Sequence, residues 1–172
     1  LALKQIEAKN PSLENKEAVA HAVGVGAVIF HDLKNDRTNN FDFALEEVVQ
    51  FEGETGPYVQ YTHARAMSIL RKANHTVDTK EAFSLTDDDA WEVLKLIENY
   101  PNVVRFAEEK CEPSAIAKFV INLAQAFNKY YAHTKVLVED EAFNSRIALV
   151  QTTASILKQG LELLGVAAPD EM

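Results

Sequence analysis

The sequence predicts an all-α fold, an antiparallel bundle of helices. Two segments near the C-terminus repeat apolar residues at steps of three and four, which is the spacing of one helix face. Only six of the 172 residues are glycine, so the chain has little material for the tight turns of a β-rich protein. Prolines and acidic residues also stand where several helices are expected to begin, at positions where the first turn tolerates them.

The first part of the chain is expected to contain one long helix. Residues 16–33 form an apolar, alanine-rich stretch with several valines among small residues. A polar loop over residues 34–40 follows and is the best candidate for a domain boundary. The chain is therefore divided into a connector, residues 1–40, and a main helical domain, residues 41–172.

Shorter elements are expected in the middle of the chain. Residues 41–50 resemble a short amphipathic helix, and residues 51–56 a turn. A longer helix then begins at Pro57, because the first helical position has no intrahelical partner for its N–H. Thr86 resembles an N-cap, since the acids that follow it suit the positive end of the helix dipole. That helix is expected to run to about Asn99.

The last two helices have the most regular apolar seams. Pro101 is expected to restart the chain, and Pro113 to open the first of these helices. One seam consists of Ile116, Val120, Leu123, Phe127 and Tyr130, the other of Phe143, Ile147, Val150, Ala154, Leu157, Leu161 and Leu164. Two narrow seams in succession are typical of antiparallel neighbours in a bundle. Gly165 is expected to end the second helix as a C′ glycine.

The charge of the chain is unevenly distributed. A net charge of −9 argues at first against a nucleic-acid partner, because neutralised phosphates supply most non-specific affinity. Residues 55–77, 113–138 and 142–161, however, contain no Asp or Glu. Their cations are Arg65, Arg71, Lys72, Lys118, Lys129, Lys135, Arg146 and Lys158. These segments predict a local basic surface, or else they are helices whose core residues leave less room for acids.

The residues offer little for catalysis or metal binding. The single cysteine, Cys111, excludes an intramolecular disulfide and a cysteine-rich zinc site. His31 and Asp32 have no second pair at a supporting spacing, so we expect no metal site. The His-x-x-Gly outline at His21 and Gly24 is a chance match to a nucleotide-binding signature. With no acid, base and nucleophile set we expect no catalytic residue, and a small hydrolase is disfavoured. No apolar run is long enough to cross a bilayer.

One face of the helix that begins at Pro57 suits an RNA partner. At about 100° per residue, an arc of roughly 80° holds two tyrosines, two cations and a serine, namely Tyr58, Tyr61, Arg65, Ser68 and Lys72. Aromatic rings beside cations suit an RNA stretch without base pairs, whose bases stack on the rings. The alternatives are tyrosines packed in a core, or a protein-interaction module anchored by Tyr and Arg. At Tyr130 the apolar seam alone favours core packing over ligand contact.

Several runs of residues resemble arginyl-tRNA synthetase, a class I synthetase with an all-helical anticodon-binding domain. The most specific run is Phe-Glu-Gly-Glu-Thr-Gly-Pro-Tyr-Val-Gln-Tyr-Thr-His-Ala-Arg, residues 51–65. Others are Val23-Gly-Val-Gly-Ala-Val28, Arg37-Thr-Asn-Asn-Phe-Asp-Phe43, Leu123-Ala-Gln-Ala-Phe-Asn128, Val136-Leu-Val138 and the ending Leu163-Leu-Gly-Val-Ala-Ala-Pro-Asp-Glu-Met172. The resemblance covers essentially the whole chain and implies a bundle of the class I synthetase anticodon-binding type.

The resemblance also implies a set of tRNA-binding residues. In the family, the helix that corresponds to the Pro57 helix lines the anticodon loop. The residues implied in this way are Tyr58, Tyr61, Ala64, Arg65, Tyr130 and Met172, to which the helical stripe adds Lys72. Ala64 and Met172 follow from the resemblance alone, whereas Tyr58, Tyr61 and Arg65 are also indicated by the stripe.

The resemblance implies a parent protein that joins arginine to its tRNA with ATP and Mg²⁺ in the cytoplasm. The catalytic signatures of the family are absent from this chain, which begins at Leu1 and looks like an excised piece. We therefore expect no cofactor and no activity in it, and we interpret residues 1–40 as the helical end of the catalytic region. The expected partners are the tRNA for arginine and the catalytic domain of the same chain, not DNA or a membrane.

Overall fold

The computed structural model describes residues 1–81 and 83–172, and in these residues it contains seven helices and no strand. This confirms the predicted all-α class. The helices are α1 (Ala2–Lys9), α2 (Lys16–Lys34), α3 (Leu45–Val48), α4 (Gly56–Ala73), α5 (Asp88–Lys110), α6 (Ser114–His133) and α7 (Phe143–Leu163).

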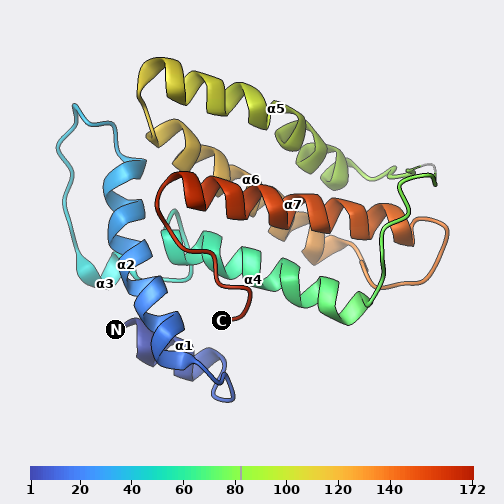
Figure 1. Cartoon of the computed structure of the whole chain (residues 1–172), viewed down its shortest axis with the longest axis horizontal. Helices are drawn as coiled ribbons and strands as arrows, with labels where there is room; N and C mark the ends of the chain where they lie inside the picture. Colours follow the sequence, from blue (N-terminus) through green and yellow to red (C-terminus); the bar gives the residue numbers. More distant parts are fainter. Residues whose placement is uncertain (82) are drawn as a thin grey trace.

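Helices α4 to α7 form the bundle (Figure 1), in which each helix runs antiparallel to the one before it. The closest packing is between α5 and α6, between α4 and α7, and between α6 and α7. Helix α2 crosses one end of the bundle against α4 and α6, and α1 packs on α2. The C-terminal residues return from the end of α7 across α4.

The two apolar seams form the centre of the core. Every seam residue of α6 is buried, and so are those of α7 from Ile147 to Leu164. Phe143, the first residue of the α7 seam, is only half-buried. The three-and-four spacing thus predicted correctly which faces of these helices meet in the bundle.

The ends of α4 and α7 follow the predicted chemistry. Helix α4 begins at Gly56 with Pro57 in its first turn, and Oγ1 of Thr55 accepts a hydrogen bond from the N–H of Tyr58 at 3.2 Å. Gly165 follows α7 with a φ of 72°, which a side chain would disfavour. The N–H of Val166 donates to the carbonyl of Leu161 at 2.9 Å, as in the Schellman motif.

Three expectations for the middle of the chain were wrong. The helix predicted over residues 41–50 is only α3, four residues long. The N-cap of α5 is Asp87 instead of Thr86, since Oδ1 of Asp87 accepts from the N–H of Ala90 at 2.8 Å. Pro101 lies inside α5 and does not restart the chain. Its ring is exposed, so water can satisfy the carbonyl that loses a helical partner.

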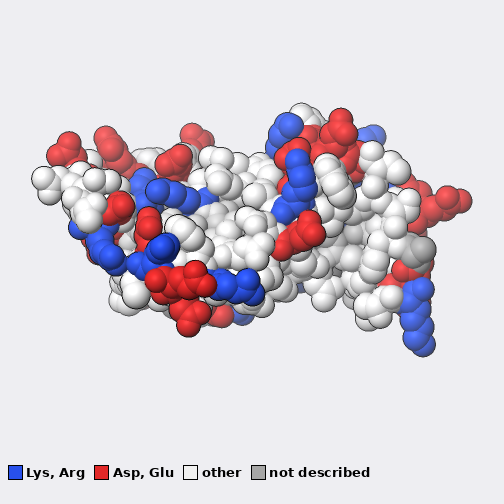
Figure 2. Space-filling model, turned by 90° about the horizontal axis from the view of Figure 1, so that it is seen from above, with Lys and Arg blue, Asp and Glu red and all other residues white. Residues whose placement is uncertain are grey.

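The acid-free segments do not form one continuous basic surface, because acids from other segments pair with three of their cations, Arg71, Lys129 and Arg146. Nζ of Lys129 lies 2.7 Å from Asp89, and Nη2 of Arg146 lies 2.7 Å from Asp140. The hydrogen bonds from Lys129 and His133 lower the pKa of Asp89. On the face seen in Figure 2, basic and acidic groups are interspersed among uncharged residues.

None of the helices in residues 1–81 and 83–172 is both long and apolar enough to span a bilayer.

Candidate nucleic-acid interface

A hollow of about 410 Å³ lies beside the C-terminal half of α4. Five of the seven predicted binding residues line it, namely Tyr61, Ala64, Arg65, Lys72 and Met172. Tyr131, near the end of α6, lines it as well. The structure thus brings together predicted residues from α4 and from the C-terminus, with Tyr131 of α6 beside them.

The side chain of Arg65 lies between two tyrosine rings. Its guanidinium carbon is 4.9 Å from the ring centroid of Tyr61 and 5.7 Å from that of Tyr131. The ring of Tyr61 also contacts Nζ of Lys9 at 5.1 Å and packs edge-on against Phe51 at 5.9 Å between centroids. Aromatic faces and cations within about 6 Å attract one another. The site therefore presents a fixed arrangement of rings and positive charge.

Asn128 of α6 holds the Arg65 side chain. Its Oδ1 accepts a hydrogen bond from Nη1 of Arg65 at 2.5 Å. Its Nδ2 donates to the hydroxyl of Tyr58 at 3.0 Å and to Oγ1 of Thr62 at 2.9 Å. One amide group of α6 therefore bonds to three residues of α4, among them Arg65, which lines the hollow. Asn128 was missed as a site residue, although it ends one of the runs that resemble the family.

The two predicted residues outside the hollow are Tyr58 and Tyr130. Tyr58 is half-buried, and its hydroxyl is engaged by Asn128. Tyr130 is 0% exposed, which contradicts the expectation that it presents a ring to a ligand. It completes the α6 seam, as the apolar spacing alone had indicated.

The exposed ring at this end of α6 belongs to Tyr131, which stacks on Phe127 at 6.5 Å between centroids. The seam could have indicated Tyr131. Because Tyr130 is the last residue of the seam and faces the core, Tyr131, the residue after it, faces away from the core.

The last seven residues, 166–172, form a C-terminal strap across α4 (Figure 1). Val166 is buried beside the bundle, and Nε2 of Gln60 donates to the carbonyl of Ala167 at 2.7 Å. Further along, Nδ2 of Asn10 donates to the carbonyl of Met172 at 3.3 Å. The side chain of Met172 is partly buried and packs with Tyr61 against the small apolar cluster between α1 and α2. The strap thus carries Met172 to the hollow.

The hollow has a positive rim. Lys72 is exposed, and no carboxylate of the described residues lies within ion-pair distance of Lys72 or Arg65. Arg71 pairs with Glu171 of the strap, with Nη2 and Oε1 3.3 Å apart. Two unpaired cations beside two rings suit an anionic, aromatic ligand, which is the chemistry of a nucleic acid without base pairs.

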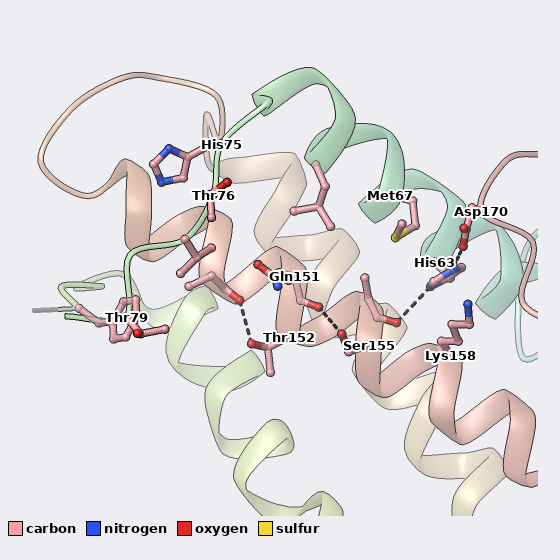
Figure 3. A pocket seen from close by; sticks show the side chains of 15 residues that line it. His63, Met67, His75, Thr76, Thr79, Gln151, Thr152, Ser155, Lys158 and Asp170 are labelled. Atoms are coloured by element: carbon pink, nitrogen blue, oxygen red, sulfur yellow. Dashed lines mark hydrogen bonds and ion pairs between the residues drawn. The ribbon is translucent and has the colours of Figure 1, made fainter. Parts of the chain in front are cut away.

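A larger groove of about 830 Å³ opens on the other side of the strap, between α4 and α7 (Figure 3). Its labelled side chains include His63, Met67, Lys158 and Asp170. The described residues contain no group of three or more His, Cys, Asp or Glu that could hold a metal ion. The smaller hollow combines rings with unpaired cations, and it is the better candidate for an RNA surface.

Two families match the chain in its sequence. The family described as "DALR anticodon binding domain" matches residues 59–172. The family described as "tRNA synthetases class I (R), catalytic domain" matches residues 1–45. The hollow and the strap therefore lie in the part that matches the first of these families.

Curated proteins and solved structures agree with these matches. The chain is 64% identical over 172 residues to an arginine–tRNA ligase of Enterococcus faecalis and covers 31% of that protein. It is 60% identical over 171 residues to that of Streptococcus equi subsp. equi, covering 99% of this chain and 30% of the relative. The arginyl-tRNA synthetase of Thermus thermophilus superposes with a TM-score of 0.92 at 36% identity, over 99% of this chain and 30% of that one. The arginyl-tRNA synthetase of Plasmodium falciparum superposes with a TM-score of 0.87 at 26% identity, over 99% of this chain and 30% of that one. The chain thus spans less than a third of the length of these relatives.

Proposed function

This chain belongs to the arginyl-tRNA synthetase family and corresponds to the C-terminal part of these enzymes, with its DALR anticodon-binding domain. On this premise we propose that the hollow beside α4 binds the anticodon loop of an arginine-accepting tRNA. The observation that carries the proposal is the convergence of Tyr61, Arg65 and Met172 on one surface. These residues come from α4 and from the end of the strap, and only the fold brings them together.

The proposed mechanism is recognition by stacking and charge. Bases of an anticodon loop are free of partners and can be splayed onto aromatic faces or onto the plane of a guanidinium. Tyr131 and Arg65 offer such faces at the edge of the hollow. A base that stacks on Tyr61 would replace one of the two cations that lie near its ring. Lys72 is exposed at the rim and is placed to meet phosphate.

The proposal extends to the whole protein of which this chain is a part. We propose that it attaches arginine to tRNA, as the names of its relatives imply. We also propose, from the family resemblance alone, that it uses ATP and Mg²⁺ and acts in the cytoplasm. Residues 1–45 match the family of the class I (R) catalytic domain, and we propose that they form the end of that domain. The part described here would bind and orient the tRNA, and ATP and Mg²⁺ would bind to the remainder of the catalytic domain.

A binding assay with two RNAs tests the proposal. An arginine-accepting tRNA and the same tRNA with its middle anticodon base changed are titrated against the whole protein by fluorescence anisotropy. We expect the changed tRNA to bind about tenfold more weakly, which corresponds to the loss of one stacked or paired base contact. Equal affinities for the two RNAs would contradict the assignment to the anticodon.

A salt titration of the same complex separates the RNA-binding function from a protein-interaction module. Phosphate contacts release counterions, so the logarithm of the binding constant falls linearly with the logarithm of the salt concentration. We expect a steep negative slope. A flat slope, or no binding at low salt, would indicate that the tyrosines anchor a protein interface instead.

A further inference from the structure

We propose that His63 and Asp170 form a latch that holds the C-terminal strap closed, and that the closed strap supplies one wall of the RNA-binding hollow. In this proposal His63 is a positioning residue, which acts on RNA only through the strap. The consequence for RNA affinity rests on the proposed function, whereas the consequence for the strap does not.

One stripe of α4 is dedicated to the strap. Gln60, His63 and Arg71 are separated by three and by eight positions, which places them along one side of the helix. Gln60 donates to the carbonyl of Ala167 at 2.7 Å. Nη1 of Arg71 donates to the carbonyl of Asp170 at 3.2 Å. His63 stands between them, with its Nε2 3.0 Å from Oδ1 of Asp170 (Figure 3).

The surroundings of His63 require a partner on the strap. The side chain is 1% exposed, and its Nδ1 lies 3.1 Å from the carbonyl oxygen of Ala154. A carbonyl oxygen only accepts, so Nδ1 carries a proton and donates. Nε2 lies 3.0 Å from Oδ1 of Asp170, its hydrogen-bond partner on the strap. An open strap would leave the buried Nε2 without this partner, which is unfavourable.

The latch lies where the strap is otherwise weakly held. Val166 at its start is buried, but Ala167, Asp170 and Glu171 are exposed. The other contacts near its end are the exposed ion pair between Arg71 and Glu171, hydrogen bonds of 3.2 and 3.3 Å to the carbonyls of Asp170 and Met172, and the packing of the partly buried Met172 side chain. Exposed ion pairs contribute little. Loss of the latch should therefore free residues 170–172 while the turn at Gly165 stays in place.

The first experiment measures the strap directly. Asp170→Ala removes the partner of His63 without opening a cavity, because the Asp170 side chain is 51% exposed. Asp170→Asn keeps a hydrogen-bond partner for Nε2, because its amide offers both an accepting oxygen and a donating N–H. Glu162→Ala removes an exposed carboxylate of α7 as the matched control. The chain has only two methionines, Met67 and Met172, so a ¹³C-methyl spectrum of methionine-labelled protein resolves the end of the strap.

We expect the Met172 methyl signal of the Asp170→Ala variant to narrow and to move to the position of an unfolded methionine. The wild type, Asp170→Asn and Glu162→Ala should keep the shift that the neighbouring rings impose. A Met172 signal that stays in place in the Asp170→Ala variant would overturn the latch. The same holds if Glu162→Ala releases Met172 as strongly.

The second experiment measures RNA. We expect Asp170→Ala to weaken binding of an arginine-accepting tRNA to the whole protein by about fivefold, and removal of residues 171 and 172 to weaken it by the same factor. The two changes together should give no further loss, and Asp170→Asn should restore most of the affinity. Release of Met172 without a change in affinity would overturn the role of the strap as a wall. If the wild type binds no tRNA, the proposed function fails, and the methyl spectra alone then judge the latch.

Discussion

Nη1 of Arg65 donates a hydrogen bond to Oδ1 of Asn128 at 2.5 Å, so a residue of α6 fixes a guanidinium of α4. A long side chain that is already held in place loses less rotamer freedom when a ligand arrives. The same amide engages Tyr58 and Thr62 and thereby ties the hollow to the interior of the bundle. The geometry of the proposed RNA surface thus depends on a residue that does not line it.

Asn128→Ala tests this dependence. The change removes the amide that bonds to Arg65, Tyr58 and Thr62, so we expect the free energy of unfolding to fall by about 1–3 kcal/mol. We also expect tRNA affinity to fall by about fivefold, because Arg65 becomes mobile. Denaturant unfolding and anisotropy titrations measure the two effects. Asn122→Ala, an exposed amide of the same helix, is the control and should change neither quantity.

Tyr61→Ala tests the aromatic surface itself. We expect the dissociation constant for tRNA to rise roughly tenfold or more, since each stacked base contributes about 1–3 kcal/mol. Tyr61→Phe keeps the ring and should bind almost as tightly as the wild type. Circular dichroism checks that the helices remain. An unchanged dissociation constant in the folded Tyr61→Ala variant would count against the hollow as the RNA site.

The binding surface could be predicted from the sequence only where local spacing decides it. The phase of α4 placed Tyr61, Arg65 and Lys72 on one side, and these three residues do line the hollow. The contribution of Asn128 depends on how α6 packs against α4, and spacing within one helix carries no information on that contact. Met172 came from the family resemblance, because a residue at the end of an irregular strap has no period to reveal its place.

Lys72 and Lys129 provide a paired test of the charges. Both lysines are exposed, but among residues 1–81 and 83–172 Lys129 has a carboxylate partner, at 2.7 Å, and Lys72 has none. We expect Lys72→Ala to weaken tRNA binding and to reduce the salt slope by about 0.7, the value for one phosphate of a single strand. Lys129→Ala should leave both the affinity and the slope unchanged. Equal effects of the two changes would mean that binding depends on overall charge and not on this rim.

The sequence predicted the fold better than it predicted the site, and the errors in the predicted fold have local causes. The seams of α6 and α7 predicted the core because long amphipathic helices bury the face that their spacing defines. Pro101 was misread because a proline inside a helix looks the same in sequence as one that starts a helix. Its tolerance depends on the exposure of one side of α5, which only the packing of the bundle sets.

The contact between α6 and α7 gives a test of packing. A Cβ atom added at Gly160 of α7 would overlap Cγ1 of Val120 in α6. Overpacking of this kind costs about 1–3 kcal/mol, against a gain of about 1 kcal/mol in helix propensity, so we expect Gly160→Ala to lower the melting temperature. At Gly24 of α2 the nearest neighbour of such a Cβ is 3.8 Å away, so Gly24→Ala should raise the melting temperature. Shifts of the same sign would contradict the close contact at Gly160.

Tyr130 allows a test that separates a core tyrosine from a binding one. Its hydroxyl is buried and has no hydrogen-bond partner among the described residues. A buried hydroxyl without a partner is unfavourable, so Tyr130→Phe should raise the free energy of unfolding by about 1 kcal/mol at neutral pH. The affinity for tRNA should not change. If the Tyr130→Phe variant is stable but binds tRNA more weakly, Tyr130 belongs to the RNA-binding site after all.

The alkaline limb of the stability profile adds an independent check on Tyr130. Burial, and to a smaller extent the charge of Asp87, raises the pKa of Tyr130 above its ordinary value. The unfolded chain then releases this proton first, at about pH 10, while the folded chain keeps it. Stability from this group is therefore complete below about pH 10 and is lost above it, by up to about 1.4 kcal/mol for each further pH unit. Urea unfolding from pH 8 to pH 11 should show a shallower decline for Tyr130→Phe than for the wild type, and parallel profiles would mean that the hydroxyl reaches water in the folded protein.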